Sequence, residues 1–91
     1  MTKSSKPLPT KLADVIVFLA GPWPSANAPA EVWQAHHQHR AAAYAHAAEH
    51  DADHKHEARY MATMEQAKAD FFRDQAQQNA QHNEHGHAQE N

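Results

Sequence analysis

Histidine is the residue type with the most chemical potential in this chain, since it occurs ten times in 91 residues while cysteine is absent. All ten imidazoles lie between His36 and His87. Imidazole changes its charge near neutral pH and is the commonest protein ligand for transition metals. Protonation of all ten would outweigh the net charge of −3, so acidification alone would reverse the sign of the surface charge.

The spacing of these histidines predicts a stripe along one side of a helix. Intervals of three and four residues, the a/d pattern of a coiled coil, join His36, His39, Ala43, His46 and His50. Such a stripe packs against another helix only with neutral or metal-bound imidazoles, because protonated ones repel each other. We therefore expect either a His-rich seam that loosens between about pH 7 and 5 or a stripe that faces solvent. The same pattern extends to Val32, Asp53, Glu57, Tyr60, Met64, Ala67 and Phe71.

The histidine spacing also admits a metal site. His46 and His50 lie one helical turn apart, and His39 and His54 extend the same ladder. Imidazole ligands without thiolate favour Zn²⁺, Ni²⁺ or Cu²⁺. The sequence thus names His39, His46, His50 and His54 as candidate metal ligands.

One segment resembles a catalytic motif. His46-Ala47-Ala48-Glu49-His50 reads as H-x-x-E-H, the pattern of inverted zinc metallopeptidases, in which both imidazoles bind zinc and the glutamate is the general base. That family also requires a distant carboxylate ligand and a large substrate-holding domain. Too little chain follows His50 to supply them, so we expect a protein that is not an enzyme.

Aromatic residues and one arginine supply candidate partner-binding positions, since both types are enriched among binding hot spots. Two interpretations remain open. The tryptophans either close a small core over Leu12, Ile16 and Leu19, or they belong to an exposed patch. The candidates are Trp23, Trp33, Arg40, Tyr44, Phe71 and Phe72.

The elements that must position these residues are helical. Leu12, Val15, Ile16 and Leu19 repeat at helical spacing after Thr10, which predicts a short helix capped by Thr10 and ending near Ala20. A proline-rich loop follows, because proline removes a donor and fixes φ. Residues 30–78 contain no glycine or proline and consist mainly of strong helix formers.

The predicted fold class is all-α, with one domain over residues 10–78 between a flexible tail (residues 1–9) and a disordered tail (residues 79–91). Residues 30–78 form either one long helix or a two-helix hairpin. The expected break is at His50-Asp51-Ala52-Asp53, because aspartate is a poor interior residue and a good N-cap.

Composition excludes several functions. Dispersed lysine and arginine argue against sequence-independent nucleic-acid binding. The apolar run at residues 15–20 is far shorter than the roughly 20 residues that span a bilayer. Three lysines before that run and small residues after it resemble a weak secretory leader. Asp14 lies next to this already short run and argues against a leader. We expect a cytoplasmic protein, with an exported or periplasmic location as the alternative.

The sequence favours a small helical interaction protein. It would bind a protein partner or form a homo-oligomer, with a histidine-based metal-binding or metal-sensing protein as the alternative.

Overall fold

The computed structural model describes the backbone of residues 8–90 and the side chains of residues 8–80. Within these residues the chain is helical and contains no strand, which confirms the predicted all-α class. In chain order the elements are α1 (Leu12–Phe18), α2 (Ala30–His50), the 3-10 helix η1 (Ala52–His54) and α3 (Lys55–Glu90). Most of the expected flexible tail, residues 1–9, lies outside the described residues.

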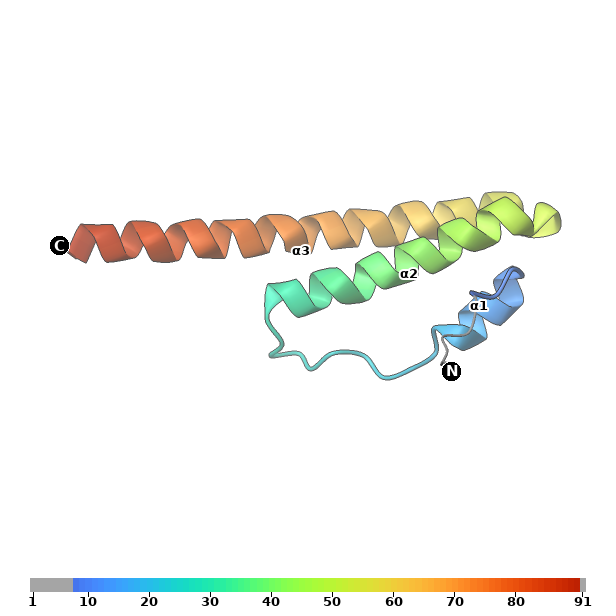
Figure 1. Cartoon of the computed structure of the whole chain (residues 1–91), viewed down its shortest axis with the longest axis horizontal. Coiled ribbons are helices and arrows are strands. Elements are labelled where there is room, and N and C mark those ends of the chain that lie inside the picture. The colour runs from blue at the N-terminus through green and yellow to red at the C-terminus, as the bar shows by residue number, and fades with distance from the viewer. Residues whose placement is uncertain (1–7, 91) are drawn as a thin grey trace, which may run out of the picture.

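The long helical segment is broken at Asp51, and α2 and α3 form an antiparallel hairpin (Figure 1). Asp51 leaves the helical conformation with φ −108° and ψ 89°, and its backbone N–H donates to the Ala47 carbonyl at 2.7 Å. The His54 backbone N–H then donates to the Asp51 carbonyl at 3.1 Å. This is the two-helix alternative, with the break in the predicted segment.

The face of α2 that lies inside the protein differs by one residue from the predicted stripe. His37, Ala41, Tyr44 and Ala48 are buried, whereas His39 and His50 are exposed. Alanine has a small side chain that lets two helices approach closely, and Ala58 and Ala69 occupy the buried face of α3. The histidine stripe is therefore displaced to the flank of α2, and only its member Ala43 is fully buried.

The continuation of the stripe along α3 does not pack against α2 and faces solvent, which is the second of the two alternatives. Tyr60, Met64 and Phe71 are 64%, 43% and 56% exposed. The buried residues Ala58, Glu65 and Ala69 come from a different face of the helix. Tyr60, Met64 and Phe71 are thus left on the outer surface of α3.

Helix α1 packs across the hairpin close to its turn (Figure 1). Leu12, Val15 and Leu19 join Tyr44 and Ala47 in one apolar cluster, to which Met61 of α3 also contributes. The predicted Thr10 cap is wrong, because Lys11 is the N-cap residue of α1 and its side chain makes no capping hydrogen bond. Instead the Leu12 backbone N–H donates to the Asp51 carboxylate at 2.9 Å.

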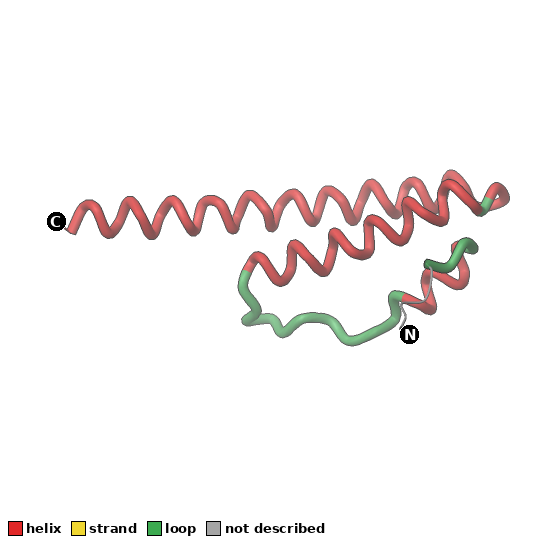
Figure 2. The backbone as a smooth tube through the Cα atoms, viewed as in Figure 1, coloured by secondary structure: helices red, strands yellow, loops and turns green. Residues whose placement is uncertain are grey.

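A loop joins α1 to α2 and runs beside the open end of the hairpin (Figure 2). It begins after Phe18, and its Ala28 backbone N–H donates to the Ser25 carbonyl at 2.9 Å. Pro29 is the N-cap residue of α2 and has φ −60°. The fixed φ of proline suits the start of a helix.

The backbone of residues 79–90 continues α3, whereas the sequence predicted no regular structure there. The segment lacks proline and contains alanine, glutamine and glutamate, which are good helix formers, and α3 continues through Gly86 to Glu90. No helix in the described residues combines the length and apolar character needed to cross a membrane.

The apolar cluster predicts a contrast between two valines of α1. Val15 is fully buried, whereas Val17 is 74% exposed. Val15→Ala should lower the free energy of unfolding by about 2 kcal/mol through lost burial and a residual cavity. Val17→Ala should change it by less than about 0.5 kcal/mol. Urea unfolding followed by circular dichroism measures both, and equal effects would show that α1 does not pack as described.

Candidate functional site

A buried ionic centre joins α2 to α3. Glu65 is 3% exposed, and its Oε1 lies 2.7 Å from His37 Nδ1. Arg40 Nε lies 3.3 Å from the same oxygen, although Arg40 Nε is not aligned for a hydrogen bond. Lys68 Nζ is 3.5 Å from Glu65 Oε2. One carboxylate is therefore shared by three basic side chains.

Two opposing effects set the pKa of Glu65. Burial raises it, but the hydrogen bond from His37 and the charges of Arg40 and Lys68 outweigh burial, so the pKa lies below its ordinary value. The carboxylate is ionised at neutral pH and acts only as an acceptor. His37 Nδ1 must therefore carry the proton and donate to Glu65 Oε1.

An aromatic layer surrounds this ionic centre at the open end of the hairpin. The rings of His37 and Phe72 are stacked, with centroids 5.7 Å apart, and Trp33 stacks on both at 5.8 Å. Trp23, from the loop, lies 4.5 Å from the ring of His36 and 6.1 Å from that of Trp33. Loop, α2 and α3 thus meet in a single cluster of rings.

His36 contributes a buried polar atom to this cluster that no other group satisfies. Its Nε2 is buried and has no hydrogen-bond partner. Burial, followed by the nearby charges of His37 and Arg40, lowers the pKa of His36 below its ordinary value. His36 and Arg40 both contact the Trp23 ring, with the His36 ring at 4.5 Å and Arg40 Cζ at 4.9 Å from its centroid, so the permanent charge of Arg40 favours a neutral His36.

The aromatic layer borders an open apolar groove of about 620 Å³. Trp33, Phe71 and Phe72 supply its aromatic wall, and the loop supplies Ala26 and Ala28. Phe71 and Trp23 are 56% and 52% exposed. Exposed aromatic groups beside a concave surface are typical of interaction sites.

A second groove, of about 520 Å³, lies between α2 and α3. Alanine supplies half of its lining, and the charged residues Glu49, Arg59 and Asp70 lie along it. It lacks the large aromatic groups that anchor a partner. The aromatic groove is therefore the stronger candidate site.

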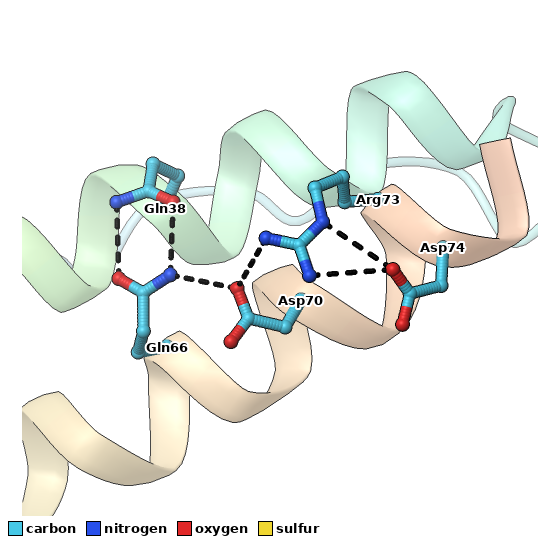
Figure 3. A network of polar contacts seen from close by, with 5 residues as sticks. All are labelled: Gln38, Gln66, Asp70, Arg73 and Asp74. Atoms are coloured by element: carbon cyan, nitrogen blue, oxygen red, sulfur yellow. Dashed lines mark hydrogen bonds and ion pairs between the residues drawn. The ribbon is translucent and has the colours of Figure 1, made fainter. Parts of the chain in front are cut away.

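Polar side chains on the outside of the hairpin align α2 with α3 (Figure 3). Gln38 and Gln66 donate to each other's amide oxygens at 3.1 and 3.2 Å. Gln66 also donates to Asp70, which accepts from Arg73. These groups are largely exposed, so each contributes little stability, but they fix the same register as His37 and Glu65.

The structure brings together only two of the four predicted metal ligands. The rings of His46 and His50 lie 4.3 Å apart. His39 instead contacts Phe18, and His54 Nδ1 lies 3.1 Å from Asp51 Oδ2. Within the described part of the chain, no three histidine or carboxylate groups converge to hold a metal ion. A metal on the His46 and His50 pair would need ligands from another molecule.

The predicted partner-binding residues separate into two groups. Trp23, Trp33, Arg40 and Phe72 lie together in the aromatic and ionic cluster, next to Phe71. Tyr44 is 2% exposed, so its assignment to a contact surface is wrong. It packs beneath α1 because the buried face of α2 differs from the predicted one.

The sequence did not identify His37 or Glu65, and it placed Asp51 at the break without predicting that its carboxylate accepts from Leu12. His37 was overlooked because the adjacent His36 fitted the predicted stripe. Glu65 resembles any exposed glutamate of a helix. The available signal was an interval of seven residues that joins Ala58, Glu65 and Phe72 on one face of α3.

Comparisons with protein-family models, curated proteins and solved structures find no match to this chain.

The ionic centre predicts a large effect of one isosteric change. Glu65→Gln removes the negative charge that pairs with Arg40 and accepts from His37, and should lower the free energy of unfolding by about 3 kcal/mol. Asp74→Asn is the matched control, because Asp74 pairs with Arg73 at the exposed surface, and it should cost less than about 0.5 kcal/mol. Urea unfolding measures both changes, and similar values would contradict a buried ion pair.

Lowered carboxylate pKa values predict acid destabilisation. The backbone hydrogen bond from Leu12, partly opposed by burial, lowers the pKa of Asp51, and the pKa of Glu65 is also lowered. As pH falls, the unfolded chain takes up protons first, near its ordinary values of about 3.9 and 4.3. The stability from these groups is therefore complete above about pH 5 and is lost as pH falls through the lower folded values.

Thermal unfolding between pH 6 and 2.5 should show this loss in the wild-type chain. The acid-dependent part should be smaller in Asp51→Asn and in Glu65→Gln. Asp53→Asn serves as the control because Asp53 is exposed. An unchanged acid limb in Asp51→Asn would mean that its carboxylate does not hold α1.

Proposed function

We propose that this chain is a non-enzymatic interaction protein that docks an apolar segment of a protein partner on its aromatic surface. We define the aromatic surface as the groove that Trp33, Phe71 and Phe72 line, together with Trp23, whose ring lies 6.1 Å from that of Trp33. The observation that carries the proposal is the 56% exposure of Phe71, which lines that groove, together with the 52% exposure of Trp23, which packs on Trp33.

The packing of the hairpin explains why this surface suits a docking role. Trp33 and Phe72 are anchored against His37, which is in turn fixed by Glu65. Their rings therefore need little ordering on binding, which reduces the entropic cost of association. Phe71 projects from the same turn of α3, with its ring 5.1 Å from that of Phe72.

The partner that fits this surface is a short amphipathic helix or another segment that carries apolar side chains. The groove lining is mostly alanine and aromatic, with Gln75 as its polar member. Apolar burial would supply most of the affinity, and the aromatic rings would act as hot spots. A second copy of this chain is included, because its own exposed Ile16 and Val17 are apolar.

The test compares two exposed aromatic residues of α3. Phe71→Ser should weaken binding at the aromatic surface at least tenfold, since a hot-spot residue contributes more than about 1.4 kcal/mol. Tyr60→Ser is the control, because Tyr60 is 64% exposed on the same helix but does not line the groove. Affinity capture from extracts of the source cells, with each full-length variant as bait, identifies partners for titration.

Proteins retained by wild type and by Tyr60→Ser, but lost with Phe71→Ser, would support the proposal. Sedimentation velocity of the same three proteins tests whether a second copy is the partner. Equal binding and equal self-association in all three would contradict docking at the aromatic surface.

A further inference from the structure

We propose that residues 21–25 form a proton-operated lid, which carries Trp23 and leaves the hairpin when His36 becomes protonated. The lid would control access to the aromatic surface, so its biological role rests on the function proposed above. Its movement is a property of the isolated chain, however, and can be measured without any partner.

The lid is attached mainly by the ring of Trp23. That ring lies 4.5 Å from the ring of His36 and 5.9 Å from that of His37, and Arg40 Cζ lies over it at 4.9 Å. Two polar contacts flank the ring. Trp33 Nε1 donates to the Ser25 carbonyl at 3.2 Å, and Arg40 donates to the Leu19 carbonyl at 3.4 Å. An attachment this small can be released without unfolding the hairpin.

His36 contacts both tryptophan rings and makes no compensating hydrogen bond. Its ring centroid lies 4.5 Å from that of Trp23 and 5.8 Å from that of Trp33, and the two tryptophan centroids are 6.1 Å apart, so the three rings form a triangle. Its Nε2 is buried and unpartnered. A proton on this nitrogen would therefore place a charge in a site that offers neither water nor an acceptor, which is costly.

The charged groups around His36 also oppose a second positive charge. On α2 the ring is near Arg40, His37 and His39, and on α3 it faces Glu65. Glu65 is the only anion of this set, and it is already shared by His37, Arg40 and Lys68. The lid itself contributes the Trp23 ring and no charged side chain between residues 21 and 25.

Attraction between a cation and an aromatic face does not remove this cost. A protonated imidazole would be drawn to the Trp23 ring, but the guanidinium of Arg40 already lies over that ring. Two cations on one ring repel each other. Departure of the lid lets water reach His36 Nε2 and removes the burial that opposes its charge.

The direction of the switch follows from the environment of His36. Burial lowers the pKa of His36 in the closed chain, so the open chain binds the proton more tightly. The lid is therefore closed above the ordinary histidine value of about 6.5 and opens as pH falls below it. Opening removes Trp23 from the Trp33 ring and exposes the part of Trp33 that Trp23 covers.

Trp33→Phe makes Trp23 the sole tryptophan and the reporter of the lid. Acrylamide quenching of Trp23 fluorescence should rise at least twofold between pH 8 and pH 5, while helicity measured by circular dichroism stays constant. His36→Phe in the same background keeps a ring but cannot be protonated, and its quenching should stay low. His39→Phe is the matched control, because His39 is an exposed neighbour, and it should keep the transition.

Three results would overturn the lid: constant quenching in the reporter chain, an equal transition in His36→Phe, or quenching that rises only as helicity is lost. A second readout uses the unmodified chain, in case the reporter variant does not fold. The indole ¹H–¹⁵N resonance of Trp33 should shift over the same pH range, because its bond to the Ser25 carbonyl breaks when the lid leaves. A resonance that does not move would also overturn the lid.

The lid and the docking proposal fail separately. If the lid opens but Phe71→Ser does not change partner binding, the lid is supported and the docking site is contradicted. A lid that stays closed, with partner binding lost in Phe71→Ser, would do the reverse.

Discussion

The shared carboxylate of Glu65 is the constraint on which the hairpin depends. Alanine makes up most of the buried apolar residues of α2 and α3, and alanine against alanine discriminates weakly between neighbouring registers. A buried charge does discriminate, because any slip would leave Glu65, His37 or Arg40 without its partner in a region with little water. The ionic centre thus contributes specificity more than net stability. The amide pair of Gln38 and Gln66 fixes the same alignment at the surface.

The aromatic surface is a direct consequence of that alignment. With His37 fixed opposite Glu65, its ring provides the plane on which Trp33 and Phe72 stack. The guanidinium of Arg40 links the ionic centre to the aromatic rings, since it pairs with Glu65 and lies over the ring of Trp23. The ion pairs inside the hairpin and the aromatic packing outside it therefore share residues. A substitution that disturbs one of them also disturbs the other.

The sequence was sufficient for the all-α class and for the segment in which a break would fall, but it left one long helix and a hairpin open and did not predict that Trp33, His37 and Phe72 pack together. Helix formers without proline predict helices, and aspartate predicts the break at Asp51. The buried face of α2 could not be predicted, because alanines at 41–43, 45, 47 and 48 complete more than one apolar stripe at helical spacing. Only pairing with α3 selects His37 over His36. The partnership of His37 with Glu65 is a tertiary contact, 28 residues apart, and leaves no local pattern.

The position of Asp51 has a kinetic consequence. Its carboxylate accepts the Leu12 backbone N–H across 39 residues, yet it reaches that position only where α2 ends and η1 begins. Contacts between α2 and α3 can form one after another, starting next to the turn. Helix α1 can dock only after the turn has positioned the Asp51 carboxylate. Closing contacts of short sequence separation costs less chain entropy. We therefore expect the hairpin of α2 and α3 to form before α1 docks, because the Asp51 carboxylate can accept from Leu12 only once the turn exists.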